Sequence, residues 1–193
     1  MRTLPIHTLS GKEEKTMKNL EEYIRTIPDY PEPGVMFRDI TSVLQDADGL
    51  HLAIDSIQEK VGDPDDFDVV IGTESRGFIF GMPVAYNLHK PFVLVRKKGK
   101  LPCETISQTY DLEYGSATVE MHKDSIKPGQ RVVIIDDLIA TGGTIEAAIK
   151  MVEALGGKVV RTVFLIELAG LNGRKRLSGY DVDVESVLCY EGK

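Results

Sequence analysis

The sequence predicts an α/β protein with a mostly parallel central sheet flanked by helices on both faces. Short apolar segments rich in β-branched residues alternate along the chain with segments whose apolar residues recur at helical spacing. That order is typical of parallel strands joined by crossover helices. Residues 131–137 also form a continuous apolar run up to two acids, which indicates a strand buried on both faces.

At the N-terminus, the pattern predicts a helix over residues 17–27, because four apolar residues recur there at helical spacing. These residues are Leu20, Tyr23, Ile24 and Ile27. Several prolines then end the helix and favour an extended, turn-rich passage over residues 27–40. Residues 50–61 are expected to form a second amphipathic helix, which Gly62 and Pro64 terminate.

The middle of the chain alternates strands with turns that carry charge. A strand over residues 69–71 runs into a polar turn and a helix over residues 78–89. Residues 91–96 form the next predicted strand, which ends in a basic turn over residues 96–100. The alternation over residues 105–121 predicts a β-hairpin that turns at residues 114–116.

The C-terminal part continues the same pattern. The buried strand over residues 131–137 leads through a Gly-rich turn into a helix over residues 145–155. Residues 158–168 are predicted as another buried strand, and residues 182–188 as one more. We therefore expect a polar, flexible tail over residues 1–16 and a single domain over residues 17–193.

Composition excludes several classes of function. The chain has 193 residues, 23 Lys and Arg against 30 Asp and Glu, and a net charge of −7. This acidic balance argues against sequence-independent binding to nucleic acid, and no apolar run approaches the ~20 residues of a membrane span. The two cysteines and four histidines show no metal-ligand spacing, so we expect a protein of the reducing cytoplasm without its own zinc site.

The strongest chemical signal lies at the end of the buried strand. Asp136 and Asp137 stand at its C-terminal end, and open α/β sheets bind ligands at that edge. The Gly-rich turn that follows opens a helix, whose free N–H groups, together with threonine hydroxyls, suit a phosphate. Carboxylates beside a phosphate make sense when the ligand carries hydroxyls, as a ribose 5-phosphate does. The predicted phosphate cradle comprises Ala140, Thr141, Gly142, Gly143 and Thr144.

Residues 132–144 resemble the phosphoribosyl-pyrophosphate (PRPP) binding motif of the type I phosphoribosyltransferases. Residues 74–78 and 96–102 also resemble segments of that family, and residues 33–40 and 112–115 resemble its adenine-specific branch. The resemblance implies the family fold, with an N-terminal hood and a mobile β-hairpin loop over the site. It implies purine salvage: transfer of the phosphoribosyl group from PRPP to adenine, giving AMP and pyrophosphate. It further implies a homodimer, and Mg²⁺ held mainly by PRPP and water.

The resemblance also implies a role for each matched residue. Asp136 and Asp137 would bind the ribose, and Glu113 would be the catalytic carboxylate that exchanges a proton with adenine. The residues implied for the pyrophosphate are Glu74, Ser75, Arg76, Gly77, Arg96, Lys97 and Lys100. Those implied for adenine are Met36, Phe37, Arg38 and Leu168, and those of the mobile loop include Tyr110 and Tyr114.

Two alternatives share the predicted fold. One is a transferase for a 6-oxopurine, namely hypoxanthine, guanine or xanthine. The other is a PRPP-sensing transcriptional regulator, which is less favoured because only about sixteen residues lie outside the predicted domain. The chain is also acidic and retains Glu113, whereas such regulators commonly lose residues of the catalytic loop.

Overall fold

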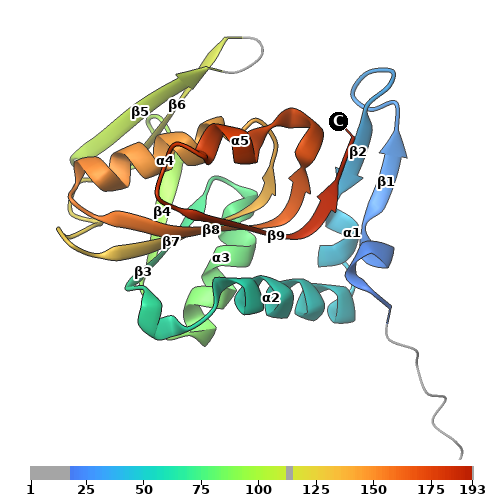
Figure 1. Ribbon diagram of the computed structural model, residues 1–193, viewed down its shortest axis with the longest axis horizontal. Helices are drawn as coiled ribbons and strands as arrows, with labels where there is room; N and C mark the ends of the chain where they lie inside the picture. The colour runs from blue at the N-terminus through green and yellow to red at the C-terminus, as the bar shows by residue number, and fades with distance from the viewer. Residues whose placement is uncertain (1–17, 112–114, 193) are drawn as a thin grey trace, which may run out of the picture.

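The computed structural model describes residues 18–111 and 115–192 of the chain (Figure 1). Seven strands form one mixed sheet in the spatial order β5-β6-β4-β3-β7-β8-β9. Their bounds are β3 Val69–Thr73, β4 Phe92–Lys97, β5 Thr105–Asp111, β6 Ser116–His122, β7 Arg131–Ile139, β8 Lys158–Leu168 and β9 Asp183–Tyr190. Strands β4, β3, β7, β8 and β9 are parallel to one another, whereas β6 is antiparallel to both β4 and β5.

The predicted fold class is therefore confirmed, and helices cover both faces of the sheet. In Figure 1, α4 (Gly143–Ala154) and α5 (Gly173–Leu177) lie on one side of β7, β8 and β9. On the other side lie α2 (Ala47–Val61) and α3 (Arg76–Asn87).

Strand β7 shows how the sequence produces two hydrophobic cores. Val132 and Ile134 pack into the core under α4, whereas Val133 and Ile135 pack into the core under α2 and α3. Successive side chains of a strand point to opposite faces, so a continuous apolar run can serve both cores at once. This burial fixes β7 in the interior of the sheet, between β3 and β8, with Asp136 and Asp137 near its carboxyl end.

The predicted helix over residues 17–27 is wrong. In the described part of that segment, Leu20–Tyr23 form only a short 3-10 helix (η1), and Arg25–Pro28 form strand β1. Strand β1 pairs antiparallel with β2 (Met36–Asp39), and the two make a separate sheet. Leu20 and Ile24 are buried as an amphipathic helix would require, but pairing with β2 gives the backbone beyond Ile24 its hydrogen bonds in an extended form.

The remaining boundaries shift by a few residues for local reasons. Helix α2 begins earlier than predicted because the Asp46 carboxylate accepts hydrogen bonds from the N–H groups of Asp48 and Gly49. Four short helices were not predicted from the sequence. They are α1 (Thr41–Leu44), η2 (Pro64–Asp66), η3 (Ala169–Leu171) and α5. Among the described helices, none is long and apolar enough to cross a membrane. The predicted tail, residues 1–16, lies outside the described residues.

Candidate active site

The carboxyl edge of the sheet carries a cavity of about 330 Å³ between the ends of β3, β4 and β7. A smaller cavity of about 110 Å³ follows the turn after β7, and the two share Tyr110, Asp136, Leu138 and Thr144. The large cavity is also lined by Glu74, Ser75, Arg76, Lys97, Val119 and Asp137. The small one is also lined by Ile139, Ala140, Thr141, Gly142, Gly143 and Ile145. The structure thus brings the acid pair, the polar turn after β3, part of the basic turn and the Gly-rich turn into one cleft.

The acid pair does not present two bare negative charges to this cleft. The Asp137 side chain is only 8% exposed, and its Oδ2 accepts a hydrogen bond from Arg76 Nε at 2.5 Å. Asp136 Oδ1 accepts from the backbone N–H of Asp137 at 2.9 Å. Desolvation raises the pKa of Asp136 well above its ordinary value, and the neighbouring charge of Asp137 raises it further. The pair can therefore lie beside a phosphate site without strong repulsion.

Gly77 lets the start of α3 approach the end of β7. A Cβ atom added there would lie 2.8 Å from both Asp136 Oδ1 and the carbonyl oxygen of Ile135, closer than side-chain carbons come. Arg76 is the first residue of α3, so this close packing places its guanidinium on Asp137. The absence of a side chain at Gly77 is what allows Arg76 to reach the acid pair.

Glu74 contacts the basic turn rather than the centre of the cleft. Its Oε2 accepts hydrogen bonds from the backbone N–H of Lys97 at 2.9 Å and from Arg96 Nε at 3.2 Å. The Lys97 hydrogen bond is the largest of the effects that lower the pKa of Glu74, and Arg96 adds to it. Arg96 Nη1 also donates to the carbonyl oxygen of Lys100. Within the basic turn, Lys97 therefore lines the cavity. Arg96 instead contacts Glu74 and the Lys100 carbonyl oxygen.

Glu120 supports the basic turn, although the sequence did not predict it as a site residue. It lies on β6, is buried, and its Oε1 accepts hydrogen bonds from the N–H groups of Gly99, Lys100 and Leu101 at 3.0–3.1 Å. A carboxylate with three backbone donors fixes the path of the basic turn. A charged residue between the apolar Val119 and Met121 was the available signal.

The Gly-rich turn has the backbone shape of an anion site. Gly142 has a φ of +78°, and α4 begins at the next residue, so the N–H groups of the first turn face outward from the helix end. The Tyr110 hydroxyl accepts a hydrogen bond from the Thr144 hydroxyl at 2.9 Å. The Tyr110 ring also lies against Gly143, where an added Cβ would be 2.8 Å from Cδ2. The β5–β6 hairpin therefore rests directly on the predicted phosphate cradle.

The residues predicted for adenine form a separate group. The ring of Phe37 packs edge-to-face on Tyr30, with centroids 5.2 Å apart. The Arg38 guanidinium lies 3.9 Å from the ring centre of Tyr190, which pairs in register with Leu168. Figure 1 shows the same arrangement, with β2 beside the end of β9. Among the described residues that line the two cavities, none comes from β2 or is Leu168.

Two of the predicted site residues, Glu113 and Tyr114, lie outside the described residues. The strands that flank them, β5 and β6, pair antiparallel, from Thr105 opposite His122 to Asp111 opposite Ser116, so Ser116 belongs to β6 and not to the predicted turn. Within residues 18–111 and 115–192, no group of three or more His, Cys, Asp and Glu is arranged to hold a metal ion.

Comparison with known proteins identifies the family. Residues 40–190 match the family model described as "Phosphoribosyl transferase domain". The adenine phosphoribosyltransferase of Agathobacter rectalis is 70% identical over 177 residues, which cover 92% of this chain and 100% of that protein. This chain belongs to the adenine phosphoribosyltransferase family.

Solved structures of the family have the same fold. The adenine phosphoribosyltransferase of Thermoanaerobacter pseudethanolicus superposes with a TM-score of 0.83 at 50% identity, covering 89% of this chain and 100% of that chain. The Saccharomyces cerevisiae enzyme superposes with a TM-score of 0.81 at 36% identity, covering 88% and 96% of the two chains. Its crystal structure contains D-2,5-dideoxy-2,5-imino-altritol 1,6-bisphosphate and adenine. The family predicted from the sequence is confirmed.

Proposed function

We propose that this chain catalyses purine salvage by transferring the 5-phosphoribosyl group of PRPP to adenine, which gives AMP and pyrophosphate. The cleft supports this reaction because a sugar with phosphates at both ends needs two anion sites with hydroxyl acceptors between them. Asp136 and Asp137 lie between the Gly-rich turn and the turn at Ser75 and Arg76. A relative's structure with a 1,6-bisphosphate and adenine is consistent with such a cleft.

In this proposal each part of PRPP has its own binding groups. The 5′-phosphate binds the N–H groups and hydroxyls of residues 140–144, where the helix dipole of α4 favours negative charge. The ribose hydroxyls bind Asp136 and Asp137. The pyrophosphate binds the turn at Ser75 and Arg76 together with Lys97, while Glu74 holds the basic turn in place.

The reaction forms the bond from adenine N9 to C1′ and breaks the bond from C1′ to the pyrophosphate oxygen. Positive charge develops on the ribose in such a transition state, and negative charge accumulates on the leaving pyrophosphate. Because the acid pair, Arg76 and Lys97 line the same cavity, we assign stabilisation of the ribose to the acid pair and stabilisation of the pyrophosphate to Arg76 and Lys97. We assign to Glu113 the acceptance of the adenine proton, a contribution of typically about 10²–10⁴-fold.

Mg²⁺ belongs to this proposal as an ion held mainly by PRPP and water. The described carboxylates of the cleft suit that arrangement, because Asp137 is paired with Arg76, Glu74 is paired with Arg96, and burial disfavours the charged form of Asp136 by raising its pKa, so the ion's place is on PRPP. Bound there, the ion would neutralise charge on phosphate oxygens, as Mg²⁺ commonly does with substrates.

Adenine would bind between β2 and the end of β8. We assign stacking to Phe37, apolar contacts to Met36 and Leu168, and recognition of the purine edge to the backbone of Arg38. The contact of Arg38 with Tyr190 supports this position, since it fixes β2 beside the strand that pairs with Leu168. A backbone donor and acceptor matched to adenine would leave a 6-oxopurine with unpaired polar groups, which can reduce its use by about 10⁴-fold.

We further propose a cytoplasmic homodimer. Ile79, Met82 and Tyr86 of α3 are 40%, 53% and 81% exposed, and their spacing places them along one face of the helix. A second copy of the chain is the partner that would cover this face, and light scattering should give twice the chain mass. The two exposed free cysteines, Cys103 and Cys189, are consistent with a reducing compartment.

The decisive experiment is base-dependent release of pyrophosphate from PRPP, measured with a panel of purines in the presence of Mg²⁺. Adenine should exceed hypoxanthine, guanine and xanthine by orders of magnitude. Equal rates would assign the chain to a broader purine specificity, and no base-dependent release would overturn the proposal. The variant Glu113→Ala should retain PRPP binding and lose most of kcat, whereas a kcat within threefold of the parent would remove Glu113 from the mechanism.

A further inference from the structure

Helix α5 packs directly against the phosphate cradle. A side chain at Gly173, its first residue, would collide with the carbonyl oxygen of Ala140. A Cβ added at Gly142 would in turn lie 3.0 Å from the carbonyl oxygen of Gly173. The backbones of α5 and of the cradle therefore touch without side chains between them, so a displacement of α5 removes the support of the cradle.

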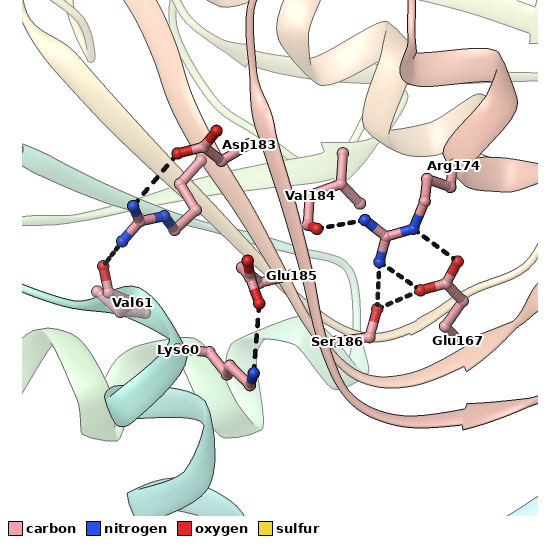
Figure 2. Close-up of polar contacts among 9 residues, drawn as sticks. Lys60, Val61, Glu167, Arg174, Asp183, Val184, Glu185 and Ser186 are labelled. Atoms are coloured by element: carbon pink, nitrogen blue, oxygen red, sulfur yellow. Dashed lines mark hydrogen bonds and ion pairs between the residues drawn. The ribbon is translucent and has the colours of Figure 1, made fainter.

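Arg174 ties α5 to the sheet (Figure 2). Its Nε and Nη2 donate to the two carboxylate oxygens of Glu167 at 3.0 and 2.6 Å, and its Nη1 donates to the Val184 carbonyl oxygen. The Ser186 hydroxyl donates to Glu167 Oε2 at 2.6 Å. The Glu167 side chain is 8% exposed, so the bidentate pair is shielded from water on the carboxylate side. Arg174 is the main cause of a lowered pKa of Glu167.

A second arginine of α5, Arg176, contacts α4, the helix that begins within the phosphate cradle. Arg176 Nε donates to Glu146 Oε2 at 2.6 Å, and Glu146 lies in the first turn of α4. Glu146 Oε1 is held from the other side by Lys150 at 2.8 Å and by the Tyr180 hydroxyl at 3.0 Å. Helix α5 thus joins the carboxyl end of β8 and the first half of β9 to the beginning of α4.

We propose that Arg174 is a positioning residue for the sugar phosphate: it fixes α5 to β8 and β9, and α5 holds the cradle in its binding shape. A helix of five residues has little stability of its own, so its position depends on such anchors. The inference rests on the proposed function, because it takes the cradle at residues 140–144 to be the 5′-phosphate site.

The test is the variant Arg174→Met, with Arg161→Met as the matched control. Arg161 also lies on β8 and also binds an acid and a carbonyl, namely Asp183 and Val61, but its acid, Asp183, is the first residue of β9, whereas Glu167 lies at the carboxyl end of β8. Calorimetry with ribose 5-phosphate and with adenine, together with steady-state kinetics, gives the readouts. Arg174→Met should weaken ribose 5-phosphate binding and raise KM for PRPP about tenfold, because small displacements of a binding group are costly.

In the same variant, kcat should fall less than threefold, because the phosphate is bound equally in the ground state and the transition state. The Kd of adenine should stay within twofold, because adenine does not bind the cradle. Arg161→Met should leave all four constants unchanged, even where it lowers the melting temperature equally. Arg174→Lys, which keeps the charge but not the planar fork, should weaken ribose 5-phosphate binding by an intermediate factor, about threefold.

The outcomes separate this inference from the proposed function. If the parent enzyme binds no ribose 5-phosphate, the proposed function fails and this inference with it. Unchanged ribose 5-phosphate binding in Arg174→Met, or equal weakening in Arg161→Met, overturns the positioning role while the function stands. If Arg174→Met does not fold, Arg174→Lys decides by the same comparison, and parent-like ribose 5-phosphate binding in that variant overturns the role.

Discussion

The cleft around the acid pair is built from charged groups that contact one another, whereas the region proposed for adenine is built from stacked side chains. In the first region Arg76 binds Asp137 and Glu74 binds the turn at Lys97. In the second, Phe37 packs on Tyr30, and Arg38 lies over a tyrosine ring. The binding of PRPP should therefore respond mainly to changes in charge. The binding of adenine should respond mainly to changes in apolar contact area.

The largest effect should come from removing the acid pair. Asp136→Ala combined with Asp137→Ala should lower kcat/KM by about 10³-fold, because charge developing on the ribose loses its stabilisation. Steady-state rates of AMP formation provide the measurement. Asp183→Ala is the control, since it removes a carboxylate at the opposite end of the sheet, and it should stay within twofold of the parent. A double variant that keeps a tenth of the activity would contradict the ribose role.

Removing the aromatic ring of Phe37 should weaken the binding of adenine and leave the binding of PRPP unchanged. Phe37→Ala should raise KM for adenine about tenfold, because stacking of a base on an aromatic side chain contributes roughly 1–3 kcal/mol. KM for PRPP, measured in the same series, should stay within twofold. An equal rise in both constants would show that the two regions are not separate.

The ion pairs of Glu146, which join α4 to α5 beside the cleft, should make the stability of the protein depend on pH. Lys150 is the first cause, and Arg176 the second, that lowers the pKa of Glu146 from 4.5 to about 2. A carboxyl group with a lowered folded-state pKa stabilises the protein above pH 4.5, and this contribution is lost as the pH falls towards 2. Glu146→Gln should therefore reduce the free energy of unfolding at pH 7 by about 1 kcal/mol, a value limited by solvent screening of the partly exposed partners.

Urea unfolding of the parent and of Glu146→Gln at several pH values gives the measurement. The difference between the two proteins should shrink steadily below pH 4.5. A difference that is constant from pH 7 to about 3 would mean that the charge of Glu146 does not stabilise the fold.

Salt should produce the smallest effect and the most direct contrast. Raising the KCl concentration from about 50 to about 500 mM should raise KM for PRPP about threefold, because salt screens partly exposed charges. KM for adenine should rise by less than about 1.5-fold, which is half of the factor expected for PRPP. Equal sensitivity of the two substrates would remove the electrostatic distinction between the regions.

Local patterns predicted the charged region well. Residues 131–144 predict a buried strand with two acids at its end and a Gly-rich turn before a helix, and the structure contains the strand, with the acids near its end, the turn and the helix. The turn after β3 and the basic turn after β4 were also identified from short segments. Each such segment carries its own signal, because strand burial, turn residues and helix starts depend mainly on neighbours in sequence.

Contacts between distant segments were not predictable in the same way. The spacing of Leu20 and Ile24 predicts a helix, whereas pairing with β2 makes the following residues strand β1. The role of Glu120 depends on three N–H groups about twenty residues away. The contact of Gly173 with Ala140 requires the position of α5, for which the sequence carried no periodic signal.

The sequence by itself determined the order of strands and helices and the chemical character of each strand end, because these depend on hydrophobic periodicity and on residues adjacent in the chain. Only the tertiary structure decided which charges neutralise one another, as with Arg76 on Asp137, and which backbones touch, as at Gly142 and Gly173. These contacts join segments between about 30 and 60 residues apart, and their geometry arises from packing both faces of the sheet at once.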